Sequence, residues 1–253
     1  TTRVDNKDPF NCLYSTIHEV GHACYEQNVS TDFLHSPLGS GVSLGIHESQ
    51  SRIFENQIGR SRHFTKWLFK EMKNCFGEFG IGDPEEFYRL VNKVETSFIR
   101  TEADEVHYNL HIMLRFELEV EVIAKNLEVE DLPEAWNKKF KDYFGRDVTK
   151  PSDGILQDVH WSIGAFGYFP TYTLGNLNAG CLFEKMKEDI PNMDERFEKG
   201  DVSSATNWLT ENIHQHGSVY EPSELIKNAT GEELTPEPFL NYLDEKFSDM
   251  YEV

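Results

Sequence analysis

The sequence predicts a mainly helical protein, with room for one small β-hairpin near residues 34–46. Apolar residues recur at helical spacing along almost the whole chain of 253 residues. Hydrophobic residues make up 38% of the sequence and aromatic residues 13%, so the chain can bury a core built from many rings. The sequence contains no internal repeat and no long linker, and we expect residues 1–253 to form a single domain.

The first expected elements are two helices separated by a flexible stretch. An apolar stripe that includes Leu13 and Ile17 predicts a helix over 9–28. The segment 36–45 is rich in Gly and Pro and predicts a loop or a small hairpin. Helical spacing resumes after it and predicts a second helix over 46–59 and a third over 61–79.

The later helices carry recognisable start and stop signals. Asp83 can cap a helix, Pro84 suits its first turn and Glu86 completes a capping box. Gly145 is typical of a helix end, and Pro170 of a helix start. These signals and the apolar pattern predict helices at 84–97, 101–127, 131–145, 170–190, 192–199, 202–213, 222–229 and 236–251, with an irregular stretch at 151–169.

Charge and cysteine content exclude several classes of function. The formal net charge is −20 and no cluster of Lys and Arg is present, which argues against nucleic acid and anionic membrane surfaces as partners. No apolar run is long enough for a membrane-spanning helix, and no signal peptide is recognisable. The four cysteines form no CxxC pair and indicate reduced thiols, so we expect a cytoplasmic protein.

The segment HEVGH, residues 18–22, predicts a metal site. On a helix His18 and His22 lie four residues apart on one face, so both imidazoles can bind the same ion. Glu19 points away from that face and can take a proton from a water molecule that the metal activates. Gly21, between the histidines, leaves room for a close neighbour. An ordinary helix with this pattern by chance is the alternative.

A catalytic zinc ion needs three protein ligands, and HEVGH supplies two. Glu48 is the best third candidate, because a Gly-rich turn can fold its helix back against the first. Arg52 and Glu55 share its helix face and can orient the site. A surface row of ion pairs is the alternative interpretation of that face. The candidates weighed for the third ligand are Asp32, His35, His47, Glu48 and Glu55.

Several motifs of this sequence, and the order in which they occur, resemble those of a known protein family. With HEVGH at 18–22 and HESQSRIFEN at 47–56, the sequence resembles the M32 metallocarboxypeptidases of the carboxypeptidase Taq type. The match continues with IRTEADEVHYNLH at 99–111, GILQDVHW at 154–161, GYFPTYTLGN at 167–176 and IHQHG at 213–217. Members of this family are typically about twice as long. The chain therefore resembles their C-terminal catalytic half and begins at the last residue, Thr1, of a D-x-R-x-T motif.

The resemblance implies a multi-helix zincin-like fold, with HEXXH plus Glu, and a set of site residues. His18, His22 and Glu48 would hold the metal, and Glu19 would be the general base and later the proton donor. Arg100 would meet the C-terminal carboxylate of a peptide, a role that suits a guanidinium because it can grip a carboxylate with two hydrogen bonds. The arginine of the first motif would lie before residue 1. The resemblance also allows a homodimer.

Further polar residues lie in the matching motifs. Peptide hydrolysis passes through an oxyanion that needs a hydrogen-bond donor, and by analogy with related zinc peptidases we expect Tyr172 and His160 in that role and Tyr168 beside the substrate. Packing of these tyrosines in the core is the alternative. His107 and His111 form a second pair four residues apart, which is expected to line the groove or the core rather than to bind a second metal.

Two more pairs complete the expected site. Glu102 and Asp104 could buttress a ligand histidine. His214 and His216 precede Gly217, and the resemblance places them at the substrate cleft. A loop position without a role is the alternative for both histidines.

The sequence thus predicts a metal-dependent carboxypeptidase that removes single residues from the C-termini of peptides. Zinc is the expected cofactor, although cobalt or manganese would fit similar donors. One alternative is an endopeptidase or dipeptidase of the same metal class, which the carboxylate-binding Arg100 would disfavour. The other is a non-catalytic fragment, with or without metal, which loss of hydrolysis in Glu19→Gln with metal retained would exclude.

Overall fold

The computed structural model describes residues 9–253, and all regular structure within them is helical. The mainly helical prediction is confirmed, but the expected small hairpin near 34–46 is wrong, because no strand occurs anywhere from residue 9 to the end. That segment is held by side-chain caps instead: the hydroxyl of Ser36 donates to the carbonyl of Phe33, and that of Ser43 accepts from the amide of Ile46. Thr1 lies outside the described residues.

The chain divides into two compact units. One contains the described residues up to Asn92 together with Leu174–Val253, and the other contains Lys93–Thr173. The prediction of a single domain over 1–253 stays a prediction. No helix among the described residues is long and apolar enough to cross a membrane.

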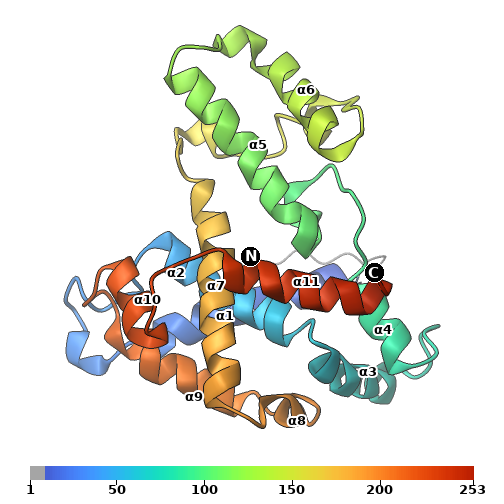
Figure 1. The fold of residues 1–253 in the computed structure, drawn as a ribbon, viewed down its shortest axis with the longest axis vertical. Coiled ribbons are helices and arrows are strands. Elements are labelled where there is room, and N and C mark those ends of the chain that lie inside the picture. The colour runs from blue at the N-terminus through green and yellow to red at the C-terminus, as the bar shows by residue number, and fades with distance from the viewer. Residues whose placement is uncertain (1–8) are drawn as a thin grey trace. The chain divides into compact units, whose positions relative to one another are not determined.

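The first unit contains most of the helices, and Figure 1 labels its α-helices. It is built from α1 (Pro9–Gln27), η1 (Thr31–Phe33), α2 (Leu44–Arg52), the π-helical η2 (Ile53–Ile58), α3 (Arg62–Phe76), α4 (Pro84–Val91), most of α7 (Pro170–Asp189), α8 (Met193–Phe197), α9 (Ser203–Asn212), η7 (His214–His216), α10 (Pro222–Thr230) and α11 (Glu237–Tyr251).

Two apolar cores hold this unit together. The larger core joins α1, α2 and η2 to α7, α9 and α10, and it includes the fully buried Tyr25, Ile46, Ile53, Leu182 and Leu209. The smaller core joins the start of α1 to α3 and α4 through Tyr14, Leu68 and Phe87. Because α1 and α2 share the larger core, burial of apolar surface holds the two helices together.

The second unit is a pair of helices with irregular connections. Its elements are η3 (Arg100–Glu102), α5 (Glu105–Ile123), η4 (Val129–Asp131), α6 (Leu132–Phe144), η5 (Pro151–Asp153), η6 (Trp161–Ile163) and the first residues of α7. Helices α5 and α6 pack against each other (Figure 1). The core of this unit includes Leu114 and Leu118 of α5 and Trp136 and Phe140 of α6.

Most helix starts agree with the sequence prediction, and the differences have local causes. Asp83 caps α4 as expected, but the helix ends at Val91 rather than near 97. The helix expected over 101–127 is interrupted, because Asp104 accepts hydrogen bonds from two backbone amides and starts α5. Gly145 ends α6 in a left-handed conformation with φ 68°.

Buried His214 predicts a pH dependence of stability. Burial and the neighbouring His47 lower its pKa to about 3, so the unfolded chain binds an extra proton between that value and about 6.5. Stability should therefore fall as the pH drops through this window. In His214→Gln the dependence should flatten by about 1.4 kcal/mol per pH unit, measured by urea unfolding between pH 7 and 4.5. An unchanged slope, or equal flattening in the control His63→Gln, whose side chain is 39% exposed, would contradict this.

Candidate metal centre

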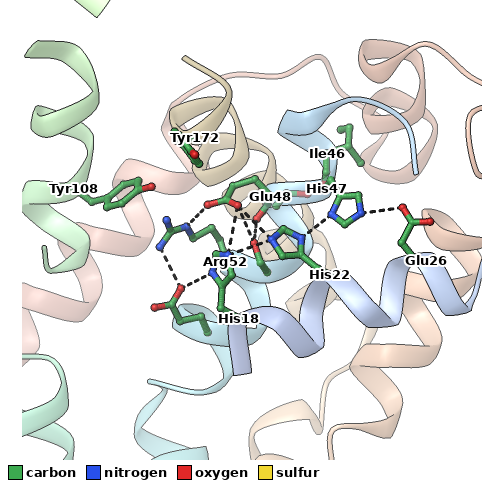
Figure 2. Close-up of polar contacts among 12 residues, drawn as sticks. His18, His22, Glu26, Ile46, His47, Glu48, Arg52, Tyr108 and Tyr172 are labelled. Atoms are coloured by element: carbon green, nitrogen blue, oxygen red, sulfur yellow. Dashed lines mark hydrogen bonds and ion pairs between the residues drawn. The ribbon is translucent and has the colours of Figure 1, made fainter. Parts of the chain in front are cut away.

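Gly21 sets the distance between α1 and α2. A Cβ atom on this residue would lie 2.5 Å from the carbonyl oxygen of Gln50 and 2.6 Å from the Cα atom of Ser51. The two backbones are therefore in direct contact at the centre of HEVGH, as the sequence suggested. This contact places Glu48, on α2, opposite His18 and His22 on α1 (Figure 2).

Three donor atoms converge at this contact. The Nε2 atoms of His18 and His22 lie 3.2 Å apart, and each lies 3.6 Å from Oε2 of Glu48. A tetrahedral ion with ligands at about 2.0–2.1 Å requires neighbouring donors about 3.3 Å apart. Within residues 9–253 this is the group of His, Cys, Asp and Glu side chains whose donor atoms approach closely enough for a metal. Asp32, in η1, and His35, in the loop after it, are both exposed and do not belong to this group.

The tautomer of His18 is fixed by Glu55. Its Nδ1–H donates to Oε2 of Glu55 at 2.8 Å, which leaves the lone pair on Nε2. Burial alone would raise the pKa of Glu55, but Arg52, His18 and Arg60 outweigh it and lower the pKa to about 2. Glu55 is therefore a carboxylate at neutral pH and can hold the proton on Nδ1, the orienting role that the sequence suggested.

His47 and Glu26 continue the contacts of His22 away from His18. Nδ1 of His22 lies 2.6 Å from Nδ1 of His47, whose Nε2 lies 2.9 Å from Oε1 of Glu26 (Figure 2). Nε2 of His22 faces Nε2 of His18. Burial, with His18 next in importance, lowers the pKa of His22 to about 4, so the imidazole is neutral and able to bind a metal.

The carboxylate of Glu48 accepts two hydrogen bonds, and its side chain packs closely against α7. Nε of Arg52 donates to its Oε1 at 2.8 Å, and the hydroxyl of Ser51 donates to its Oε2 at 3.2 Å. A Cβ atom on Gly175 of α7 would lie 2.5 Å from Cγ of Glu48, so the next-to-last residue of the GYFPTYTLGN motif is a glycine that makes room for this side chain. The sequence analysis missed this function of Gly175.

The donor set fits a divalent cation. Two imidazole lone pairs and one carboxylate oxygen face each other at 3.2–3.6 Å, and such electron-rich atoms repel one another unless a cation lies among them. Neutral imidazole and carboxylate suit zinc, and also cobalt or manganese. Two neutral donors and one anion would leave part of the ion's charge available to polarise a substrate.

Glu55 lies in the π-helical η2, which follows α2 directly. The amide of Gly59 donates to the carbonyl of Phe54 at 2.9 Å, the five-residue spacing of a π-helix. Oε2 of Glu55 faces Nδ1 of His18, while Glu48 faces Nε2. No signal in the sequence predicts this element, which appears as an ordinary helix over 46–59.

Glu19 lies exposed on α1, next to His18. It is close enough to His22 for its charge to act on the pKa of that imidazole, although it is the smallest of the contributions. The side chain is therefore beside the donor set and outside it. Its expected role as general base stays a prediction.

The second unit contains a cluster of buried charges around Arg100. This side chain is 6% exposed, and its guanidinium donates to Asp158 at 2.8 and 3.1 Å and to the hydroxyl of Tyr108 at 3.0 Å. Arg115 donates to the other oxygen of Asp158 at 2.7 Å. Burial would raise the pKa of Asp158, but Arg115 and Arg100 lower it. The sequence analysis missed Asp158, Arg115 and Tyr108, because nothing in their spacing pairs them with Arg100.

The predicted aromatic residues gather within the same unit. His160 Nε2 and the hydroxyl of Tyr172 are 3.1 Å apart, and the rings of Tyr168 and Tyr172 lie 5.5 Å apart. Burial lowers the pKa of His160, which favours its neutral form. In that form its Nε2 can accept the hydroxyl proton of Tyr172 or donate to the hydroxyl oxygen.

The remaining predicted residues have local structural partners. His214 is fully buried, and its Nε2 lies 2.9 Å from Oε1 of Gln50, so its ring contacts α2 through this side chain. His216 is half-buried against the ring of Tyr220. Asp104 accepts from His107 Nδ1 at 2.8 Å and Glu102 is exposed, and neither is among the contacts of His18 or His22. His111 is fully buried among core rings.

The sequence model of one protein family, the carboxypeptidase Taq (M32) metallopeptidases, matches residues 1–247. The chain belongs to this family. Carboxypeptidase 1 of Bacillus subtilis is 45% identical over 99% of the chain and 50% of the relative, and thermostable carboxypeptidase 1 of Pyrococcus furiosus is 44% identical over 98% and 50%. The structure of an M32 carboxypeptidase from Deinococcus radiodurans R1 superposes with a TM-score of 0.97 and 46% identity, covering 100% of this chain and 51% of that one.

These comparisons confirm the family that the sequence motifs indicated. The chain spans about half the length of the curated relatives it matches. The likeness covers both units, since the match with the solved structure covers the whole chain.

The contact at Gly21 predicts a sensitive substitution. Gly21→Ala should force α1 and α2 apart, cost about 1–3 kcal/mol of stability and weaken zinc binding by about tenfold or more. Thermal unfolding and competition with a chromogenic chelator would measure both effects. The control Val20→Ala alters an exposed neighbour and should leave both nearly unchanged. Wild-type zinc affinity in Gly21→Ala would show that the close approach is not required.

Proposed function

We propose that this protein is a metal-dependent carboxypeptidase that removes single residues from the C-termini of peptides. The observation that carries the proposal is the convergence of His18, His22 and Glu48 with donor separations suited to one tetrahedral ion. Membership of a metallopeptidase family supports it, as do relatives that are named carboxypeptidases. Zinc is the ion that we propose.

The proposed chemistry divides among a few side chains. A divalent ion bound by the three donors would polarise the scissile carbonyl and lower the pKa of a water molecule towards neutrality. Glu19, exposed beside the donor set, would accept the proton of the attacking water and pass it to the leaving amine. Glu55 and His47 would keep the protons of His18 and His22 on Nδ1, away from the reaction.

Recognition of the substrate's end is proposed to depend on the second unit. Arg100 and Arg115 share the single carboxylate of Asp158, so this cluster carries one uncompensated positive charge. A buried site with such a charge attracts an anion, and the free C-terminus of a peptide is a carboxylate. Tyr172, next to His160, is the proposed donor to the oxyanion, with Tyr168 beside it.

A pair of peptides tests the proposal. The zinc-loaded protein should release single residues in sequence from a peptide with a free C-terminus, and it should leave the C-terminally amidated twin intact. Mass spectrometry of the products, with and without a chelator, would show this directly. Internal cuts in both peptides would contradict the carboxypeptidase proposal and favour an endopeptidase. No cleavage by the loaded chain would favour a non-catalytic fragment.

The variant Glu19→Gln separates catalysis from metal binding in the same assay. The amide cannot accept the proton, so the rate should fall by about 100-fold or more while zinc stays bound. Glu224→Gln, at an exposed position of α10 in the same unit and outside the donor set, serves as a charge-matched control. Full activity in Glu19→Gln would exclude Glu19 as the base.

A further inference from the structure

One face of α1 carries His18, His22 and Glu26, each four residues from the next, and α2 covers it with His47 and Glu48 (Figure 2). We propose that His47 and Glu26 form a relay that fixes the proton of His22 on Nδ1 and thereby directs its Nε2 lone pair to the metal. His47 and Glu26 would be positioning residues, and His47 would not be a ligand. The proposal rests on the metal site of the proposed function.

The carboxylate of Glu26, at the end of this chain of contacts, sets the direction of both hydrogen bonds. Glu26 is a carboxylate and can only accept, so the proton in its 2.9 Å contact belongs to Nε2 of His47. A neutral imidazole with a proton on Nε2 has its lone pair on Nδ1. The 2.6 Å contact between the two Nδ1 atoms therefore requires the proton to be on His22. Nε2 of His22 is left as an acceptor facing His18 and Glu48.

The Gly-rich loop before α2 holds this relay in place. Oε1 of Glu26 also accepts from the amide of Gly41 at 3.2 Å, and the amide of Val42 donates to the hydroxyl of Tyr25 at 3.0 Å. The ring of Tyr25 packs 5.3 Å from the ring of His47. A Cβ atom on Gly41 would lie 2.7 Å from the Tyr25 ring and 3.1 Å from Cδ2 of His47, so the loop needs a glycine at this point.

The two ligand histidines are supported in different ways. His18 meets a carboxylate directly, since Glu55 accepts from its Nδ1 at 2.8 Å. His22 reaches a carboxylate only through His47, and that carboxylate, Glu26, is 46% exposed. Solvent weakens the contribution of an exposed charge. Loss of His47 should therefore cost more metal affinity than loss of Glu26, and the effect of Glu26 should vanish when His47 cannot transmit it.

Three variants separate the relay from simple packing. His47→Phe keeps a ring against Tyr25 but has no acceptor for His22. His47→Asn places a carbonyl oxygen where Nδ1 was, so it can accept the same proton while losing Glu26. Glu26→Ala removes the far end alone. His63→Phe is the matched control, because this histidine also pairs with a carboxylate, Glu198, at 3.2 Å on a different part of the first unit.

Zinc affinity, measured by competition with a chelator, should fall by about 10- to 100-fold in His47→Phe and by about three- to tenfold in Glu26→Ala. His47→Asn should resemble Glu26→Ala. Adding Glu26→Ala to His47→Phe should change affinity by less than about twofold, and His63→Phe should match the wild type. Independent, multiplicative losses in the double variant would overturn the relay, as would wild-type affinity in His47→Phe.

The tautomer itself can be observed without metal. In the metal-free protein labelled with ¹⁵N-histidine, NMR should show His22 protonated on Nδ1 and His47 on Nε2, with His22→Gln used for assignment. In His47→Phe the resonances of His22 should show a mixture of tautomers, and in His47→Asn the proton should return to Nδ1. An Nε2–H tautomer of His22 in the wild type would overturn the proposal. Failure of the wild type to bind zinc would count against the proposed function instead, because the tautomer is read separately.

Discussion

The contact between α1 and α2 at Gly21 is the constraint on which the candidate site depends. A catalytic zinc site usually has three protein ligands, so two histidines on one helix need a third donor from another element. Glu48 can approach them because no side chain separates the two backbones at Gly21. Apolar burial around Tyr25 and Ile46 holds the two helices together. The positions of the three donor atoms thus follow from packing, at a place where one added methyl group would disturb them.

Packing brings the donors together, and hydrogen bonds decide how they are presented. Each histidine of the proposed metal site is contacted at Nδ1, His18 by Glu55 and His22 by His47, and the proposed tautomers direct both lone pairs to the same point. Arg52 joins the two halves of this network, since it donates to both Glu48 and Glu55. A site arranged in this way has little left to reorganise when a cation binds, which is the condition for tight and selective binding.

The sequence predicted the features that depend on local spacing. The pair in HEVGH, the close neighbour at Gly21 and the approach of Glu48 all follow from helical periodicity and a Gly-rich turn. It could not predict the relay through His47 and Glu26, because these residues meet only after two helices have packed in a particular register. The π-turn around Glu55 has no sequence signal, and the expected hairpin failed because serine caps stabilise a loop as readily as glycines allow a turn.

The central claim is that His18, His22 and Glu48 hold one metal ion. Anomalous diffraction at the zinc edge from crystals of the zinc-loaded protein tests it most directly. We predict one peak per chain, about 2.0–2.2 Å from both Nε2 atoms and from a carboxylate oxygen of Glu48. A peak bound through His47 or Glu55 in place of one of these donors would contradict the account, as would a loaded protein whose zinc lies elsewhere.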